Sequence, residues 1–82
     1  MKITITIQLL SSNHKLDIQV DQAQRIKTTL RVLAENRSDF GSVNNVSEVR
    51  IKHSGRRVST ERTYEEASIY SGTELIIEKY NE

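Results

Sequence analysis

The chain has 82 residues, the size of one domain, and we expect residues 1–82 to form a single domain. Its composition, 35% hydrophobic and 28% charged, is ordinary for a soluble globular domain and argues against wholesale disorder. With 12 basic and 11 acidic residues, the net charge of +1 gives no strong push toward nucleic acid or an anionic membrane.

Several protein classes are excluded by what the sequence lacks. Cysteine is absent, which excludes disulfides, thiol catalysis and cysteine-based zinc sites. No apolar run approaches the ~20 residues that a membrane span needs. The N-terminal residues 1–5 alternate apolar and polar side chains, whereas a signal peptide would show a continuous apolar stretch. The sequence therefore predicts a cytoplasmic protein.

The first two predicted elements are β-strands. Isoleucine or leucine occupies every second position from Ile3 to Leu9, and the same alternation returns from Leu16 to Val20 after a short polar break at 11–14. A period of two with many β-branched residues is typical of strands that have one apolar face. Two such runs around a short polar loop predict a β-hairpin.

An amphipathic helix is expected next. Asp21 and Gln24 have the spacing of a capping box, in which Asp21 accepts a hydrogen bond from the exposed amide of Gln24. Apolar residues then recur at helical spacing for about three to four turns, with charged residues mainly on the other side. We expect this helix to pack on the hairpin, because each must bury its apolar stripe. The stripe comprises Ala23, Ile26, Leu30, Leu33 and Ala34.

The helix is followed by a loop and a third strand. Residues 36–47 are polar and predict the loop. Val49 and Ile51 alternate with charged residues, which predicts a strand at 49–52. The candidate apolar anchors of the loop are Phe40 and either Val43 or Val46.

The last third of the chain predicts short elements. A turn at 54–55 leads to a short strand at 57–59, and residues 63–69 are irregular or form a short helical turn. Gly72 is expected at positive φ, which glycine adopts at little cost. A final strand follows at 75–77. The order β-β-α-β-β-β excludes a doubly wound nucleotide fold and predicts an α+β domain.

This last third resembles ubiquitin. A glycine turn leads through a short strand to an apolar residue, an acidic turn and an isoleucine, and a polar turn then precedes a closing strand. The resemblance implies a ubiquitin-like β-grasp fold, in which a mixed sheet packs on one helix. Tyr64 and Ile69 would then close the bottom of the core, and Leu75 and Ile77 would lie beside the first strand. The segments that carry the resemblance are Gly55-Arg56-Arg57-Val58, Glu61 to Ile69 and Gly72 to Ile77.

Two departures from ubiquitin change the expected function. Conjugated relatives end in diglycine, whereas this chain ends in Lys79-Tyr80-Asn81-Glu82. We therefore do not expect conjugation or the related sulfur-carrier chemistry. The positions that match the isoleucine and valine of ubiquitin's apolar binding patch are Lys52 and Glu78. General ubiquitin receptors should not recognise a charged surface in place of an apolar one.

A short, cysteine-free chain of this kind is similar to the YukD/EsaB-like family of bacteria, which accompanies type VII (WXG-type) secretion systems. This resemblance implies a non-conjugated cytoplasmic accessory or regulator of the secretion machine, with a protein partner such as a membrane component of the apparatus. Two alternatives remain: a ubiquitin-like modifier or sulfur carrier, and a stand-alone β-grasp domain that binds a small GTPase, another protein or RNA. The similar segments are Ile3 to Ile7, Arg25 to Leu30 and Ile69 to Leu75.

The sequence predicts no enzyme and no cofactor or metal site. His14 and His53 lack a matching acid at ligand or triad spacing. Glu65 and Glu66 are adjacent, so their carboxylates point apart and do not converge on one substrate atom. The three glycines are isolated from one another, so no phosphate-cradling loop is present.

A basic cluster is the candidate interaction site, since five cations fall within thirteen positions. One interpretation is a solvated sheet face that prevents edge aggregation. A second is a docking site for an acidic protein surface. Nucleic acid is disfavoured, because few aromatic residues accompany the charges and the net charge is near zero. The cluster comprises Arg50, Lys52, Arg56, Arg57 and Arg62.

Two other surfaces stay open as contact sites. An exposed Tyr70 or Tyr80 would be a reasonable anchor for a partner. A β-grasp sheet also has exposed edges, so a homodimer through strand pairing is an alternative to a monomer.

Overall fold

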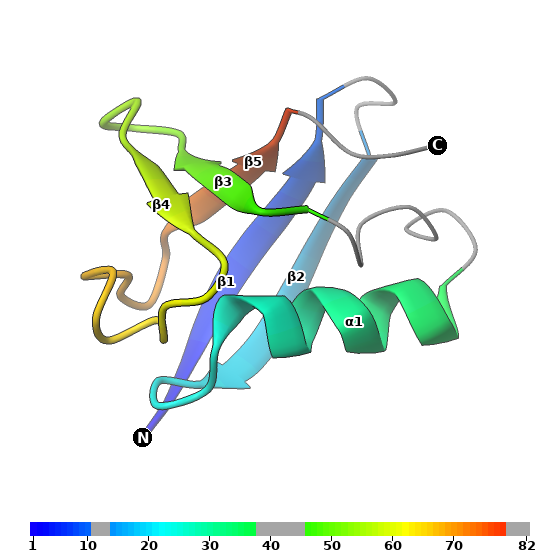
Figure 1. Ribbon diagram of the computed structural model, residues 1–82, viewed down its shortest axis with the longest axis horizontal. Helices are drawn as coiled ribbons and strands as arrows, with labels where there is room; N and C mark the ends of the chain where they lie inside the picture. Colours follow the sequence, from blue (N-terminus) through cyan, green and yellow to red (C-terminus); the bar gives the residue numbers. More distant parts are fainter. Residues whose placement is uncertain (11–13, 38–45, 79–82) are drawn as a thin grey trace.

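The computed structural model describes residues 1–10, 14–37 and 46–78, and its elements follow the expected order β-β-α-β-β-β (Figure 1). Every predicted element whose residues are described is present. The observed ends of these elements lie within two residues of the expected ends, except at the start of the helix. The elements are β1 (Lys2–Leu9), β2 (His14–Asp21), α1 (Ile26–Asn36), β3 (Glu48–Ile51), β4 (Arg57–Ser59) and β5 (Glu74–Ile77).

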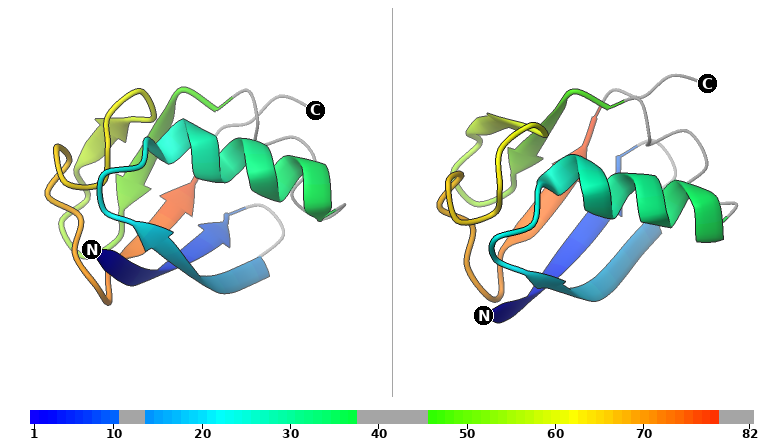
Figure 2. Two further views of the ribbon diagram at one scale, coloured as in Figure 1. Left: turned by 90° about the horizontal axis from the view of Figure 1, so that it is seen from below. Right: turned by 60° about the horizontal axis from the view of Figure 1, so that its bottom comes forward.

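The five strands form one mixed sheet in the order β2-β1-β5-β3-β4. β1 pairs with β5 in parallel, and the other neighbours are antiparallel. In the parallel pair, Ile7 lies beside Leu75 and Leu9 beside Ile77, so the closing strand lies beside the first strand as predicted. Figure 2 shows α1 lying across one face of this sheet, which confirms the α+β class.

The core lies between α1 and the sheet, and the alternation of the strands determines which side chains enter it. All four apolar residues of β1 are buried, together with Ile26, Leu30 and Leu33 of α1. Tyr64 and Ile69 have no exposed surface, which confirms that they close the core. Val46 is buried, whereas the other candidate anchors, Phe40 and Val43, lie outside the described residues.

The predicted capping box at Asp21 is wrong. The helix begins at Ile26, and Arg25 precedes it in an extended conformation without a capping hydrogen bond from its side chain. The Asp21 carboxylate instead accepts a hydrogen bond from the Ala23 N–H at 2.9 Å, and the Gln24 N–H donates to the Asp21 backbone carbonyl at 3.0 Å, so both bonds close a local turn. Ala23 is exposed and lies before the helix, so it does not extend the apolar stripe.

The first turn of α1 is capped by a distant segment. The Ile26 N–H donates to the Arg62 carbonyl at 3.0 Å, and the Lys27 N–H donates to the Thr60 carbonyl at 2.9 Å. These bonds satisfy N–H groups that an α-helix leaves without an intrahelical partner. The helix therefore starts where a backbone that comes later in the sequence can meet it.

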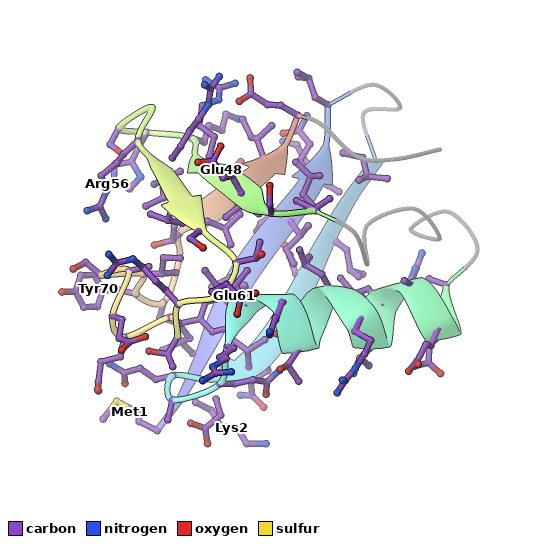
Figure 3. All side chains as sticks on the ribbon, in the orientation of Figure 1. Met1, Lys2, Glu48, Arg56, Glu61 and Tyr70 are labelled. Carbon is purple, nitrogen blue, oxygen red and sulfur yellow. The ribbon has the colours of Figure 1, made fainter. Side chains whose placement is uncertain are left out.

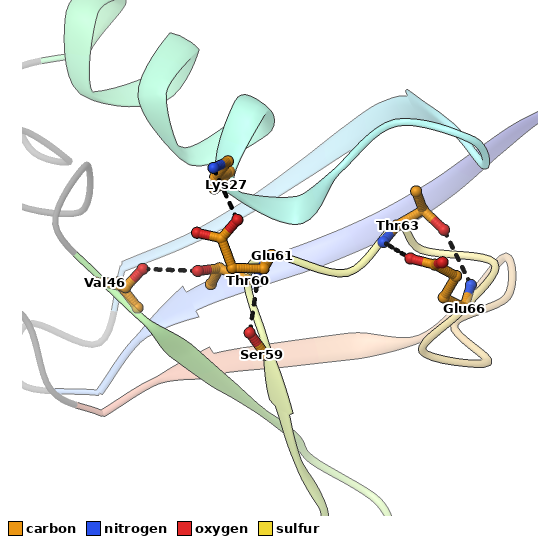
Figure 4. A network of polar contacts seen from close by, with 7 residues as sticks. All are labelled: Lys27, Val46, Ser59, Thr60, Glu61, Thr63 and Glu66. Atoms are coloured by element: carbon orange, nitrogen blue, oxygen red, sulfur yellow. Dashed lines mark hydrogen bonds and ion pairs between the residues drawn. The ribbon is translucent and has the colours of Figure 1, made fainter.

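A reciprocal cap is found elsewhere, at Thr63 and Glu66 (Figure 4). The Thr63 N–H donates to the Glu66 carboxylate at 2.9 Å, and the Glu66 N–H donates to the Thr63 hydroxyl at 3.0 Å. This is the bonding of a capping box, and it organises the turns at 63–68. The bond from the Thr63 backbone holds the pKa of Glu66 below its usual range.

Two glycines have the positive φ that their turns require. Gly55 has φ 72° in the turn between β3 and β4, and Gly72 has φ 93° in the turn before β5. The expectation for Gly72 is confirmed by this positive φ, and the Gly72 N–H donates to the Thr4 carbonyl of β1 at 2.8 Å. Neighbouring Tyr70 is 62% exposed, and Tyr80 lies outside the described residues.

Truncating the core at Leu30 tests these assignments. Leu30 is 1% exposed, so Leu30→Ala is expected to lower the free energy of unfolding by about 2–5 kcal/mol. Ile5→Ala, at a β1 residue that is also 1% exposed, should cost a similar amount. The matched control is Val32→Ala in the same helix, at a residue 46% exposed, with an expected change within ~0.5 kcal/mol. Urea unfolding measures all three, and equal costs at Leu30 and Val32 would contradict the packing.

The buried Tyr64 hydroxyl predicts a loss of stability at alkaline pH. Burial raises the pKa of Tyr64 from 10.0 to about 12, and the nearby Thr29 hydroxyl offsets only part of this effect. As the pH rises past 10, the unfolded chain therefore loses this proton before the folded chain does. The stabilisation is complete below pH 10 and is lost between pH 10 and 12, by about 2–3 kcal/mol in total.

The comparison that isolates this effect is Tyr64→Phe, which removes the ionisable group and keeps the ring. Denaturant unfolding between pH 9 and 12 should show a steeper fall for the native chain than for Tyr64→Phe. Lysine ionisation affects both proteins equally. Two parallel stability curves would show that the Tyr64 hydroxyl ionises as readily in the folded chain as in the unfolded one.

Candidate functional site

The five predicted basic residues all lie on β3, on β4 or on the segments that follow these strands. Val49, Ile51 and Val58 point into the core, so the residues that alternate with them occupy the face of the sheet away from α1, here called the outer face. The structure places the five cations in two overlapping sets. Arg50, Lys52 and Arg57 have carboxylate partners, whereas Arg56, Arg57 and Arg62 line one groove.

Arg50 and Arg57 share one carboxylate on the outer face. They are directly opposite each other in the β3–β4 ladder. Like charges in this position repel. Glu78 lies at 3.2 Å from the Arg50 Nε and at 3.4 Å from an Arg57 terminal nitrogen, so a single carboxylate compensates both guanidinium groups.

This ion-pair group covers an apolar residue. Ile76 is opposite Arg50 in the β3–β5 ladder and is only 6% exposed. It does not belong to the core beneath α1, and it lines a small outer-face pocket with Arg50, Arg57 and Glu78. The aliphatic stems of long charged side chains commonly cover apolar surface in this way. The outer face is therefore charged at its surface and apolar directly below.

Lys52 also has a local counterion. Its ammonium nitrogen lies 3.2 Å from the Glu74 carboxylate, and its backbone N–H donates to the Glu74 carbonyl at 3.0 Å. Both side chains are more than a third exposed, so this pair contributes little to stability. It nevertheless leaves less positive charge on this part of the outer face than the sequence indicates.

Arg56, Arg57 and Arg62 line a common groove beside β4, here called the arginine groove. Arg56 projects from the turn between β3 and β4 (Figure 3), and one of its terminal nitrogens donates to the Ala67 carbonyl at 2.6 Å. That bond holds the guanidinium against the turns at 63–68. The described residues that line it are Arg56, Arg57, Val58, Ser59, Arg62, Glu66 and Ala67.

Among the described residues that line the arginine groove, Glu66 is the acidic one, and its carboxylate accepts a hydrogen bond from the Thr63 backbone N–H. Glu61, which the sequence places among the basic residues, turns to the helix instead. Its carboxylate lies 2.8 Å from the Lys27 ammonium, as Figure 4 shows, and this contact lowers the pKa of Glu61. Neither acid therefore neutralises the groove through a direct ion pair with its arginines.

The sequence found the basic residues but missed their counterions. Glu74 and Glu78 lie on β5 or directly after it, outside the thirteen-residue window that defines the cluster. The strand alternation could have indicated these counterions, because it places residues 74, 76 and 78 on one face of the closing strand. The match of Lys52 and Glu78 to ubiquitin's patch stays a prediction, and Glu78 contacts Arg50 and Arg57 rather than Lys52.

Two other candidate groups lie at the surface. His53 is exposed in the turn after β3, and Glu65 is exposed beside the Thr63–Glu66 cap. In the part of the chain that the structure describes, no three histidine, aspartate or glutamate side chains gather as a metal site would require. Across the same residues, no helix has the length and apolar character needed to cross a membrane.

Comparison with known proteins identifies the fold. No family model and no curated protein sequence matches the chain. Among solved structures, a protein designed de novo on the basis of ubiquitin superposes with a TM-score of 0.74 at 22% identity, covering 98% of this chain and 89% of that one. The chain has the ubiquitin-like β-grasp fold. At this level of identity, the similarity shows the fold alone.

Natural ubiquitin-like proteins match as well. The C-terminal ubiquitin-like domain of mouse tubulin-specific chaperone e gives a TM-score of 0.72 at 13% identity, covering 100% of this chain and 89% of that one. Ubiquitin of Caldiarchaeum subterraneum gives 0.66 at 17% identity, with 96% of each chain covered. These similarities agree with the ubiquitin-like β-grasp fold.

A charge swap tests the shared carboxylate. Arg50→Glu places a second carboxylate beside Glu78 over the buried Ile76, and we expect a loss of roughly 1–2 kcal/mol in the free energy of unfolding. The double variant Arg50→Glu/Glu78→Arg again sets one carboxylate between two guanidinium groups and should recover most of this loss. Lys52→Glu, in the more exposed pair, is the control and should cost less than ~1 kcal/mol.

The measurement is urea unfolding at low and high salt. Loss of stability in Arg50→Glu without recovery in the double variant would show that Arg50 acts through packing alone. In that case the ion-pair description of the outer face is wrong.

Proposed function

We propose that the chain is a non-catalytic protein-interaction module whose arginine groove binds an acidic segment of a partner protein. The observation that supports this most is that Arg56, Arg57 and Arg62 line one groove. Among the described residues the lining contains one carboxylate, that of Glu66, and it is bonded to backbone; Arg57 is also partly compensated by Glu78 on the outer face. Arg50 and Lys52 flank the groove on the outer face, with their charge partly compensated by Glu78 and Glu74.

An acidic protein segment suits this groove better than nucleic acid. Guanidinium groups bind carboxylates through paired, planar hydrogen bonds. Three guanidinium groups that line one groove therefore favour a segment that carries several carboxylates. A protein that binds nucleic acid usually presents a broad positive surface. The net charge of this chain is only +1, and acidic residues partly neutralise its outer face.

We further propose that the chain acts in the cytoplasm of a bacterium as a YukD/EsaB-like accessory or regulator of a type VII secretion system. The support is the resemblance of three segments, which also supply buried residues of the core, including Ile5, Ile26 and Ile69. These segments specify the scaffold rather than the partner. The partner is therefore inferred from the groove, and a membrane component of the secretion apparatus with an acidic cytoplasmic segment fits it.

The test measures binding to the cytoplasmic part of that membrane component, taken from the genes that neighbour this one, by isothermal titration calorimetry. Arg57→Glu/Arg62→Glu is expected to weaken binding at least roughly tenfold, because two attractive contacts become repulsive. The charge-matched control is Arg31→Glu, an exposed arginine on α1, which should bind like the native chain. Binding by the native chain should also weaken as salt increases.

Two results would count against the proposal in different ways. Equal binding by the native chain and the double variant would exclude the arginine groove as the site. Binding of the native chain to an acidic peptide but not to the secretion component would leave the groove in place and exclude the secretion role.

A further inference from the structure

The strand β2 offers an unpaired edge that is unusual in its length. The sheet order places β2 at one edge and β4 at the other. β4 has three residues, whereas β2 has eight, and all eight are in register with β1. Within the described residues no strand pairs with the other side of β2, as Figure 1 also shows. A long regular edge of this kind is a template for another strand.

The hydrogen-bond phase of the hairpin determines which groups this edge presents. The Gln22 N–H donates to the Met1 carbonyl at 2.9 Å, so Gln22 bonds toward β1. In an antiparallel ladder the bonding residues alternate, so residues 16, 18 and 20 bond toward β1 as well. The N–H and C=O groups that point away from the sheet therefore belong to Lys15, Asp17, Gln19 and Asp21.

We propose that the partner of this edge is β2 of a second copy, paired antiparallel across a two-fold axis at Ile18. In this register Lys15 of one copy lies opposite Asp21 of the other, and the symmetry repeats this attractive pair. Leu16 lies opposite Val20, and Asp17 lies opposite the uncharged Gln19. The outward-pointing backbone groups of residues 15, 17 and 19 and the Asp21 N–H gain a hydrogen-bond partner, while the Asp21 carbonyl, which already accepts the Gln24 N–H at 3.0 Å, accepts a second bond.

Side-chain facing, charge and the length of the ladder disfavour the neighbouring registers. A shift by one residue would place apolar side chains opposite polar ones on both faces. An axis at Asp17 would place this carboxylate against its own copy, and an axis at Gln19 would place Asp17 opposite Asp21. Like charges directly opposite each other are destabilising. An axis at Leu16 avoids such pairs but joins only residues 14–18 of the two described β2 strands. The register at Ile18 is therefore the longest one without a like-charge pair.

The burial of the β2 side chains agrees with a second copy as the partner of this edge. Leu16 and Ile18 pack against the core but remain partly exposed at the edge, whereas Val20 is 5% exposed. In the dimer the apolar row of β2 would face the same row of the second copy, which removes the remaining surface from water. Asp17 accepts a hydrogen bond from the Thr6 hydroxyl at 2.6 Å, so a neutral residue opposite it is suitable.

Covalent trapping tests the register directly. The native chain has no cysteine, so Ile18→Cys can form a disulfide only between two chains. Residues on the axis of a non-hydrogen-bonded pair have Cα atoms about 4.5 Å apart, close enough to be bridged under mild oxidation. Gln19→Cys is the matched control, because the register places Asp17 rather than residue 19 opposite it. Disulfide dimers from Ile18→Cys, with much less from Gln19→Cys, are expected.

Analytical ultracentrifugation over a range of concentrations tests the charge pairing. Lys15→Glu is expected to raise the dimer dissociation constant roughly tenfold or more, since one substitution creates two repulsive pairs. Lys15→Glu/Asp21→Lys restores opposite charges and should recover the dimer. Arg31→Glu, on the exposed face of α1, should dimerise like the native chain. Thermal unfolding of each variant separates loss of the dimer from loss of the fold.

Three results would overturn the proposal. They are a native chain that stays monomeric at millimolar concentration, equal trapping of the two cysteine variants, and a charge-swapped variant that folds but does not recover the dimer. Because the arginine groove lies beside the opposite edge strand, each of these results would leave the proposed function unaffected.

Discussion

The parallel pairing of β1 with β5 is the contact on which the rest of the structure depends. It joins the first strand to the last described one through the ladder from Thr6–Glu74 to Leu9–Ile77. On one side β1 carries the hairpin partner β2, and on the other side β5 carries β3 and then β4. Because these segments are far apart in sequence, the pairing must overcome a large loop-closure entropy. The buried isoleucines and leucines of both strands supply the compensating stabilisation.

The segment from Thr60 to Gly72 connects the sheet and the helix to the arginine groove. Thr60 is 3% exposed, its hydroxyl donates to the Val46 carbonyl at 2.9 Å, and its own carbonyl accepts the Lys27 N–H. At the other end, Gly72 is bonded to Thr4 of β1. The segment is therefore attached to α1 and to the sheet, and it carries Arg62 and the carbonyl that holds Arg56. The arginine groove is positioned by the same bonds that cap the helix.

Most of the fold could be predicted because strand and helix patterns report burial locally. The alternation from Ile3 to Leu9 and the spacing of Ile26, Leu30 and Leu33 indicate one buried face each, whatever that face meets. The start of the helix was predicted wrongly from Asp21 for a physical reason. Its first N–H groups are satisfied by the carbonyls of residues 60 and 62, and no local pattern reports such a contact. The reciprocal cap formed instead at Thr63 and Glu66.

The candidate site also has features that the sequence predicts and features that only the tertiary structure decides. The sequence by itself determined the order of the elements, the residues of the core and the set of five cations, because alternation, helical spacing and charge are properties of neighbouring residues. Only the tertiary structure decided which cations have counterions. Glu74 and Glu78 reach Lys52, Arg50 and Arg57 because of the registers of β3 with β5 and with β4. Arg56 and Arg62 line one groove because the segment after β4 folds back beside it. Electrostatic neutralisation acts between atoms close in space, and distance along the chain does not specify that closeness.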